Sequence, residues 1–140
     1  MDRKEFLSKL SMGAAFALTV GCFGSCKKEE DQPQATLVDE NVDFTIDLTD
    51  PTNGNLLNNG GFIFNGSVII AKDVNGNYVA ATKVCSHENL PDIVFRNNEW
   101  FCPAHDARFN INGQGQNDKG KRNLLVYNTE LNGDLLRVYS

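Results

Sequence analysis

Two short motifs in the second half of the chain combine cysteine with histidine. Residues 85–87 are Cys-Ser-His and residues 102–105 are Cys-Pro-Ala-His, with fourteen residues between them. Together they contain both histidines of the protein and two of its four cysteines. Thiolate sulfur and imidazole nitrogen are ligands that zinc, copper and iron accept. The sequence therefore predicts a metal centre, whose candidate ligands are Cys85, His87, Cys102 and His105.

A strand and a hairpin are expected to position these two motifs. The segment Tyr78–Val84 has the composition of a strand and leads directly into Cys85. Ile93–Phe95 and Trp100–Phe101 flank the polar residues 96–99, which predicts a hairpin. Because a hairpin runs out and back, the loops before and after it lie at the same end. We therefore expect the two motifs to meet around one small group.

The remaining sequence has the pattern of short strands joined by tight turns. Between Val38 and Leu48 apolar and polar residues alternate, as in a strand with one buried face. Asn75-Gly76 predicts a type I′ hairpin turn, which needs positive φ at both central positions, and Asn132-Gly133 predicts another hairpin. No amphipathic helix is expected after Cys26. The predicted fold is all-β, a small antiparallel sandwich or incomplete barrel with a metal-binding hairpin subdomain.

The paired motif resembles the signature of Rieske [2Fe-2S] proteins, and the similarity covers roughly residues 37–139. The resemblance implies a Rieske-like fold and a single-electron carrier with a [2Fe-2S] cluster. Two thiolates neutralise the 2+ core of the oxidised cluster, so one added electron leaves only one negative charge. Such clusters have potentials of about −150 to +300 mV. The family implies two ligands for each iron: Cys85 and Cys102 on one, His87 and His105 on the other.

Departures from the family pattern indicate which branch the chain resembles. Rieske proteins of cytochrome bc complexes have a disulfide between the two cluster loops, and the matching positions here are Leu90 and Ala104. This is expected for the ferredoxin-like branch. High-potential members place a Ser and a Tyr hydroxyl beside the cluster sulfurs, where this chain has Ala107 and Phe109. Asp106 replaces a usual Gly and, with Glu88, adds negative charge. We expect a potential in the lower part of the range.

Structural zinc is the alternative interpretation of the same four ligands. Two cysteines and two histidines also form closed tetrahedral zinc sites. The Cys-x-His spacing of residues 85–87 is unusual for a zinc finger, whose paired ligands normally stand two to four residues apart. If zinc nevertheless occupied the four ligands, the alternative function would be a zinc-stabilised surface binding module without redox activity.

Residues 1–26 have the composition of an export signal. The basic segment Met1–Lys9 precedes an apolar run, Leu10–Val20, that is too short to span a bilayer comfortably. Arg3–Lys9 resembles a twin-arginine signal, with Lys4 in place of the second arginine. A general secretory signal is the alternative.

Two cysteines lie where such a signal is cleaved. Cys26, or alternatively Cys22, follows a small residue, as does the lipidated cysteine of bacterial lipoproteins. The residues after Cys26 are charged and have nothing to bury. We expect a signal peptide over 1–26, a flexible charged tether over 27–37 and the Rieske domain over 38–140. The mature protein is then expected on the periplasmic side of a bacterial membrane or in the cell envelope, held by a lipid anchor.

The composition also restricts the partners. The formal net charge is −5, so nothing indicates the basic face that a nucleic-acid-binding protein needs, and no nucleic-acid partner is expected. The four predicted ligands include both histidines, so none remains for the mononuclear iron site of a Rieske oxygenase. We expect an electron carrier or oxidoreductase subunit rather than a stand-alone enzyme. Its partner is expected to be a redox protein or an oxidoreductase large subunit: a cytochrome, a molybdenum oxidase or a quinol-oxidising complex.

Overall fold

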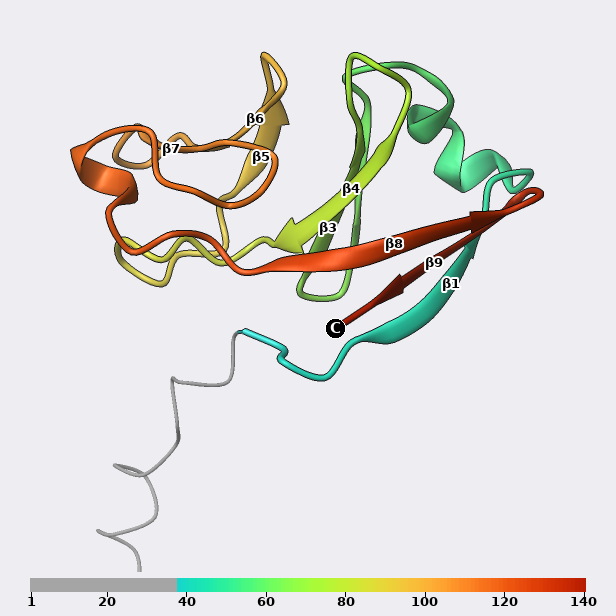
Figure 1. Ribbon diagram of the computed structural model, residues 1–140, viewed down its shortest axis with the longest axis horizontal. Coiled ribbons are helices and arrows are strands. Elements are labelled where there is room, and N and C mark those ends of the chain that lie inside the picture. The colour runs from blue at the N-terminus through green and yellow to red at the C-terminus, as the bar shows by residue number, and fades with distance from the viewer. Residues whose placement is uncertain (1–37) are drawn as a thin grey trace, which may run out of the picture. The chain divides into compact units, whose positions relative to one another are not determined.

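The structure is a computed structural model that describes residues 38–140 (Figure 1). The predicted signal segment 1–26, the tether 27–37 and both candidate lipidation sites, Cys22 and Cys26, lie outside the described residues. Between residues 38 and 140 no helix is long and apolar enough to cross a membrane. The regular elements of this region are antiparallel strands and short 3-10 helices, which confirms the predicted all-β fold.

Six strands form one antiparallel sheet in the order β1-β9-β8-β4-β3-β2. Figure 1 shows that this sheet curls strongly, as in an incomplete barrel. Its strands are β1 (Asp43–Asp47), β2 (Phe62–Asn65), β3 (Val68–Lys72), β4 (Tyr78–Thr82), β8 (Val126–Asn132) and β9 (Leu135–Tyr139).

Strand β1 has the alternation that its sequence predicts. Ile46 is buried and Phe44 half-buried, whereas the residues between and beside them are exposed. Phe44 lies opposite Val138 and Ile46 opposite Leu136, so the apolar side chains of β1 and β9 share one face of the sheet. Both β9 residues are fully buried. The hydrophobic effect therefore fixes the register of this pair, because a shift by one residue would expose every apolar side chain.

After β1 the chain forms a 3-10 helix, η2 (Pro51–Leu57). The Asp50 carboxylate accepts a hydrogen bond of 2.9 Å from the Thr52 N–H, and Pro51 follows with its φ already restricted to a helical value. The helix places Leu56, which is completely buried, in the core of the six-stranded sheet, and leaves Leu57 exposed.

The turn chemistry corrects one prediction. In the loop after β3 only Gly76 has a positive φ, so Asn75-Gly76 is not a type I′ turn. The reason is that the Asp73 carboxylate accepts hydrogen bonds from the N–H groups of Asn75 and Asn77, both at 2.8 Å, and closes a longer loop. Positive φ at two central positions occurs instead at Asn97 and Asn98, between paired residues 96 and 99. That pattern matches type I′.

A second, three-stranded sheet contains the predicted hairpin. It has the order β5-β6-β7, with β5 spanning Val94–Arg96, β6 Glu99–Cys102 and β7 Ala107–Phe109. Its core includes Trp100 and Phe109, which lie opposite each other and are fully buried. The chain enters this subdomain after β4 and leaves it before β8, and β4 and β8 are direct neighbours in the large sheet. The whole metal-binding part is thus inserted between two adjacent strands.

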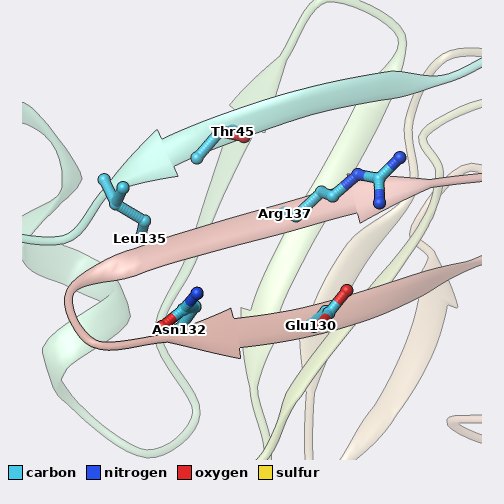
Figure 2. A pocket seen from close by; sticks show the side chains of 5 residues that line it. All are labelled: Thr45, Glu130, Asn132, Leu135 and Arg137. Carbon is cyan, nitrogen blue, oxygen red and sulfur yellow. The ribbon is translucent and has the colours of Figure 1, made fainter.

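The outer face of β1, β9 and β8 is mostly polar, with Leu135 as an exposed apolar residue among the polar side chains (Figure 2). Arg137 lies in its middle row, between Thr45 and Glu130, beside a shallow depression. Its guanidinium donates two hydrogen bonds to the Asp43 carboxylate, at 2.9 and 2.8 Å. These bonds hold the pKa of Asp43 below its usual value. The pair joins β9 to the edge strand β1 on the solvent side.

Candidate metal centre

Both predicted cysteine ligands are buried at the entrance to the small sheet. Cys85 follows β4 by three residues and Cys102 is the last residue of β6; their exposed fractions are 2% and 1%. Neither forms a disulfide. The Cys85 N–H donates to the Leu90 carbonyl at 2.7 Å, and the Cys85 carbonyl accepts from the Asn89 N–H at 2.8 Å. The first loop is therefore closed by its own backbone.

The surroundings of the two thiols suit ligation by a metal. The pKa of Cys85 is raised to about 11, chiefly by burial and in smaller part by the neighbouring Cys102 thiol, while the backbone N–H groups of His87 and Glu88 act in the opposite direction. A buried thiol of this kind stays protonated in neutral water, whereas a cation beside it stabilises the thiolate. The N–H groups already directed at the Cys85 sulfur can also hydrogen-bond a ligated thiolate.

The two histidines lie together. Their ring centroids are 5.1 Å apart and the rings meet edge to face at 64°. Nδ1 of His87 is buried and has no hydrogen-bond partner among the described residues, and the same is true of the hydroxyl oxygen of Ser86. An unsatisfied buried nitrogen costs about 1–3 kcal/mol. A metal ion can accept the lone pair of this imidazole nitrogen, so the donor set fits a metal beside the histidines.

Glu88 is a neighbour of the centre whose contact the sequence did not reveal. Its carboxylate lies 3.4 Å from Nε2 of His105, and candidate donor atoms of Glu88 and the two histidines lie within 4.8 Å of one another. Both side chains are partly exposed. The Cys-Ser-His-Glu order indicates only that Glu88 is near the first pair of ligands; its contact with His105 on the second loop comes from the structure.

Two of the positions that depart from the family pattern lie beside the site as buried apolar residues. Ala107 pairs with Cys102, and Phe109 pairs with Trp100; both are completely buried. Neither offers a hydroxyl. Asp106 has a φ of +61°, a conformation in which glycine is the least strained residue. The expected glycine-like conformation is thus retained after His105 although the residue is Asp.

A sequence profile described as the Rieske [2Fe-2S] domain matches residues 42–130. The chain belongs to this family. The match spans more than half of the chain and contains all four predicted ligands, and Rieske domains bind a [2Fe-2S] cluster. For this Rieske protein the cofactor is therefore an iron–sulfur cluster rather than zinc. A comparison with curated protein sequences gives no match.

Solved Rieske structures are similar in fold. The ferredoxin of carbazole 1,9a-dioxygenase from Nocardioides aromaticivorans IC177 is 24% identical with a TM-score of 0.51, over 59% of this chain and 86% of that chain. The quaternary ammonium Rieske monooxygenase CntA in its apo form is 15% identical with a TM-score of 0.52, over 76% of this chain and 34% of that chain. A weaker structural similarity, with a TM-score of 0.46 and 25% identity, links 52% of this chain to 76% of the cyanobacterial plasma membrane Rieske protein PetC3 from Synechocystis PCC 6803.

The Rieske chain described here spans 28% to 34% of the monooxygenase chains that it matches. Family and fold together support a role in electron transfer. The predicted Rieske-like architecture, a curled antiparallel sheet with a small cluster-binding sheet, is confirmed.

Proposed function

We propose that the protein is an exported, lipid-anchored carrier of single electrons. In this proposal Cys85 and Cys102 hold one iron of the [2Fe-2S] cluster, and the two histidines hold the other. The observation that supports it most directly is that the two loops place their buried thiols beside each other and bring their partly exposed imidazoles to 5.1 Å between ring centroids. One all-sulfur end and one imidazole end are what a Rieske cluster requires.

The surrounding residues divide the centre into a protected and an accessible side. When bound, the cluster accepts and returns one electron at a potential that its ligands and hydrogen bonds set. The cysteines lie against the core of the small sheet, where Trp100 and Phe109 exclude water. The rings of His87 and His105 are partly exposed, so a docked partner can approach closest through them. Electrons are expected to enter and leave on the histidine side.

The expected potential follows from the same surroundings. Ala107 and Phe109 supply no hydroxyl to the sulfurs, and the Glu88 carboxylate lies beside His105. Fewer hydrogen bonds and added negative charge both make the reduced state less favourable. The proposal therefore places the potential in the lower part of the Rieske range, below the members that have both hydroxyls.

The partner in this proposal is an oxidoreductase or another redox protein. The proposed cluster ligands include both histidines of the chain, so no second redox site with histidine ligands can be built from this sequence. Substrate chemistry then belongs to the partner, of which a cytochrome, a molybdenum oxidase and a quinol-oxidising complex are the candidates.

One preparation tests the redox proposal. The purified full chain should contain two irons and two acid-labile sulfides, and the reduced protein should give an EPR signal whose average g lies below that of four-thiolate clusters. Replacing Cys85, Cys102, His87 or His105 by alanine should abolish or change the signal, whereas Asn53→Ala, far from the centre, should leave it intact. A colourless protein with one zinc and no iron would overturn the proposal.

Export and anchoring are tested separately. In a bacterial host that processes lipoproteins, the full chain should enter the membrane fraction and incorporate labelled fatty acid. Cys26→Ser should release it into the soluble fraction, and Cys22→Ser should leave it bound. The reverse pattern would assign the lipid to Cys22, and fatty-acid incorporation that neither substitution reduces would refute the anchor.

A further inference from the structure

The segment between β7 and β8 folds back onto the second ligand loop. It is the orange segment of Figure 1 and includes the 3-10 helix η3 (Asp118–Gly120), which contacts β7. Asn117 lies immediately before η3. Its side-chain Nδ2 donates to the Asp106 carbonyl at 2.6 Å, and its Oδ1 accepts from the Arg108 N–H at 3.2 Å. One amide side chain therefore binds the backbone on both sides of Ala107.

We propose that Asn117 is a positioning residue for the cluster, which holds the loop Cys102–His105 in the shape that ligation requires. This inference rests on the proposed function of that loop. The loop begins at Cys102, which β6 anchors through its pairing with Ala107. It ends at His105, directly before Asp106. The two bonds from Asn117 fix that end, because they set the orientation of the peptide groups that follow His105.

The conformation of Asp106 shows why such a bond is needed. Its φ of +61° is the left-handed conformation, which costs a residue with a Cβ about 1–2 kcal/mol. Asp tolerates this conformation better than most residues but does not select it as glycine does. The bond from Asn117 Nδ2 to the Asp106 carbonyl is made in this conformation and favours it over the extended one. Relaxation of Asp106 would rotate His105 away from His87.

Backbone hydrogen bonds hold the chain on both sides of Asn117. The Gln116 N–H donates to the Arg108 carbonyl at 2.8 Å, so the residue before Asn117 is paired with the strand that follows the ligand loop. On the other side, the Gly120 N–H donates to both the carbonyl and the Oδ1 of Asn117, at 3.0 and 3.1 Å. The side chain is thus shared between capping η3 and holding the ligand loop.

Two substitutions separate these tasks. Asn117→Asp keeps an oxygen acceptor for the Arg108 and Gly120 N–H groups but removes the donor to Asp106. Asn117→Ala removes both. Asn53 provides the matched control: its Nδ2 donates to the Asp47 carbonyl at 2.9 Å at the end of β1, outside the small sheet. Asn53→Ala removes the same kind of bond far from the cluster.

The measurements are the rate at which a chelator removes iron from the loaded full chain and the shape of its EPR signal. Loss of an outer-shell partner typically lowers metal affinity by about 10–100-fold. We expect Asn117→Asp and Asn117→Ala to lose iron about ten times faster than the wild type and to broaden the EPR signal, with Asn53→Ala unchanged in both. If Asn117→Asp loses iron at the rate of Asn53→Ala, the inference is wrong and Asn117 is only a helix cap.

A second measurement distinguishes this result from a failure of the proposed function. If the wild type contains no [2Fe-2S] cluster, the proposed function fails and the chelator experiment does not apply. Amide hydrogen exchange in the metal-free chain then decides. Exchange at Ala107, whose N–H belongs to the same peptide group as the Asp106 carbonyl, should be faster in Asn117→Asp than in the wild type or Asn53→Ala. Equal exchange in all three proteins would overturn the positioning role by itself.

Discussion

Replacing Gly115 by alanine should destabilise the protein by about 3 kcal/mol. A Cβ on this residue would lie 1.9 Å from the Gly120 carbonyl oxygen and 2.6 Å from its carbon, both backbone atoms that no rotamer change can move. Ordinary contacts begin at 3.4 Å, so the two backbone segments would have to separate by about 1.5 Å. Gly115 and Gly120 lie on either side of Asn117 in the chain, so this close approach closes the loop that contains Asn117.

The expected loss of stability follows from the hydrogen bonds near Gly115 and Gly120. Separation would break the hydrogen bond from the Gly115 N–H to Asn123 Oδ1, at 3.1 Å, and strain those between Asn117 and the Gly120 N–H. Each such bond contributes about 1 kcal/mol net, and overpacking a filled site costs a further 1–3 kcal/mol. With a urea dependence of about 1–3 kcal/mol per molar, a loss of about 3 kcal/mol lowers the unfolding midpoint by about 1–3 M.

The assay is urea unfolding followed by the fluorescence of Trp100, the single tryptophan, which is completely buried in the small sheet. Gly54→Ala is the control, because a Cβ there meets nothing within 4 Å and the φ of Gly54 is not positive. That change should raise stability by up to about 1 kcal/mol through the unfolded chain. A Gly115→Ala protein with the midpoint of the wild type would refute the close approach.

Three further outcomes are expected. Asp106→Ala should lower the free energy of unfolding by about 1 kcal/mol and Asp106→Gly should not, since a φ of +61° is strained for alanine and free for glycine; urea unfolding of both variants decides. Arg137→Ala should raise the pKa of Asp43 in a carboxyl NMR titration, because the hydrogen bond from Arg137 is the main cause of its depression. Because the pKa of Asp43 is lower in the folded than in the unfolded protein, the pair stabilises the fold at pH values above 3.8, the unfolded value. This contribution disappears as the pH falls through the folded-state pKa, so the unfolding free energies of wild type and variant should converge in acid. His105→Cys should retain some cluster at a more negative potential, since a thiolate replaces a neutral imidazole; an unchanged potential in film voltammetry would contradict this.

The sequence was sufficient for the parts of the fold that depend on local patterns. The alternation around Phe44 and Ile46 predicted β1 and its buried face, and the polar residues 96–99 predicted the hairpin that brings the motifs together. These features are local, because side-chain period and turn propensity are properties of a few neighbouring residues. The meeting of the two thiols could be predicted since a hairpin has only one end at which its flanking loops join.

The features that depend on side chains from elsewhere could not be predicted in this way. The type I′ assignment at Asn75-Gly76 is wrong because the carboxylate of Asp73 competes for the backbone N–H groups of the loop. The bond between Asn117 and Asp106 joins residues eleven apart across a loop with no periodic pattern. No signal in the polar stretch around Asn117 distinguishes that residue from its neighbours. Only the unusual Asp after His105 hinted that something must hold the backbone there.

The neighbouring positions of β4 and β8 have a consequence for how this protein can change over evolution. Ala81 pairs with Val126, so the chain leaves the large sheet and returns to it at almost the same point. Everything between them forms a cassette whose two ends are held together by strand pairing. Its core is shared with the large sheet, because Ile69, Ala71 and Ala81 belong to the same buried cluster as Trp100 and Phe109. Its loops can be exchanged, lengthened or retuned to another potential while the large sheet keeps its core. A graft of residues 83–125 onto another sheet therefore needs two adjacent antiparallel strands at the acceptor site and apolar side chains in the places that Ile69, Ala71 and Ala81 occupy here.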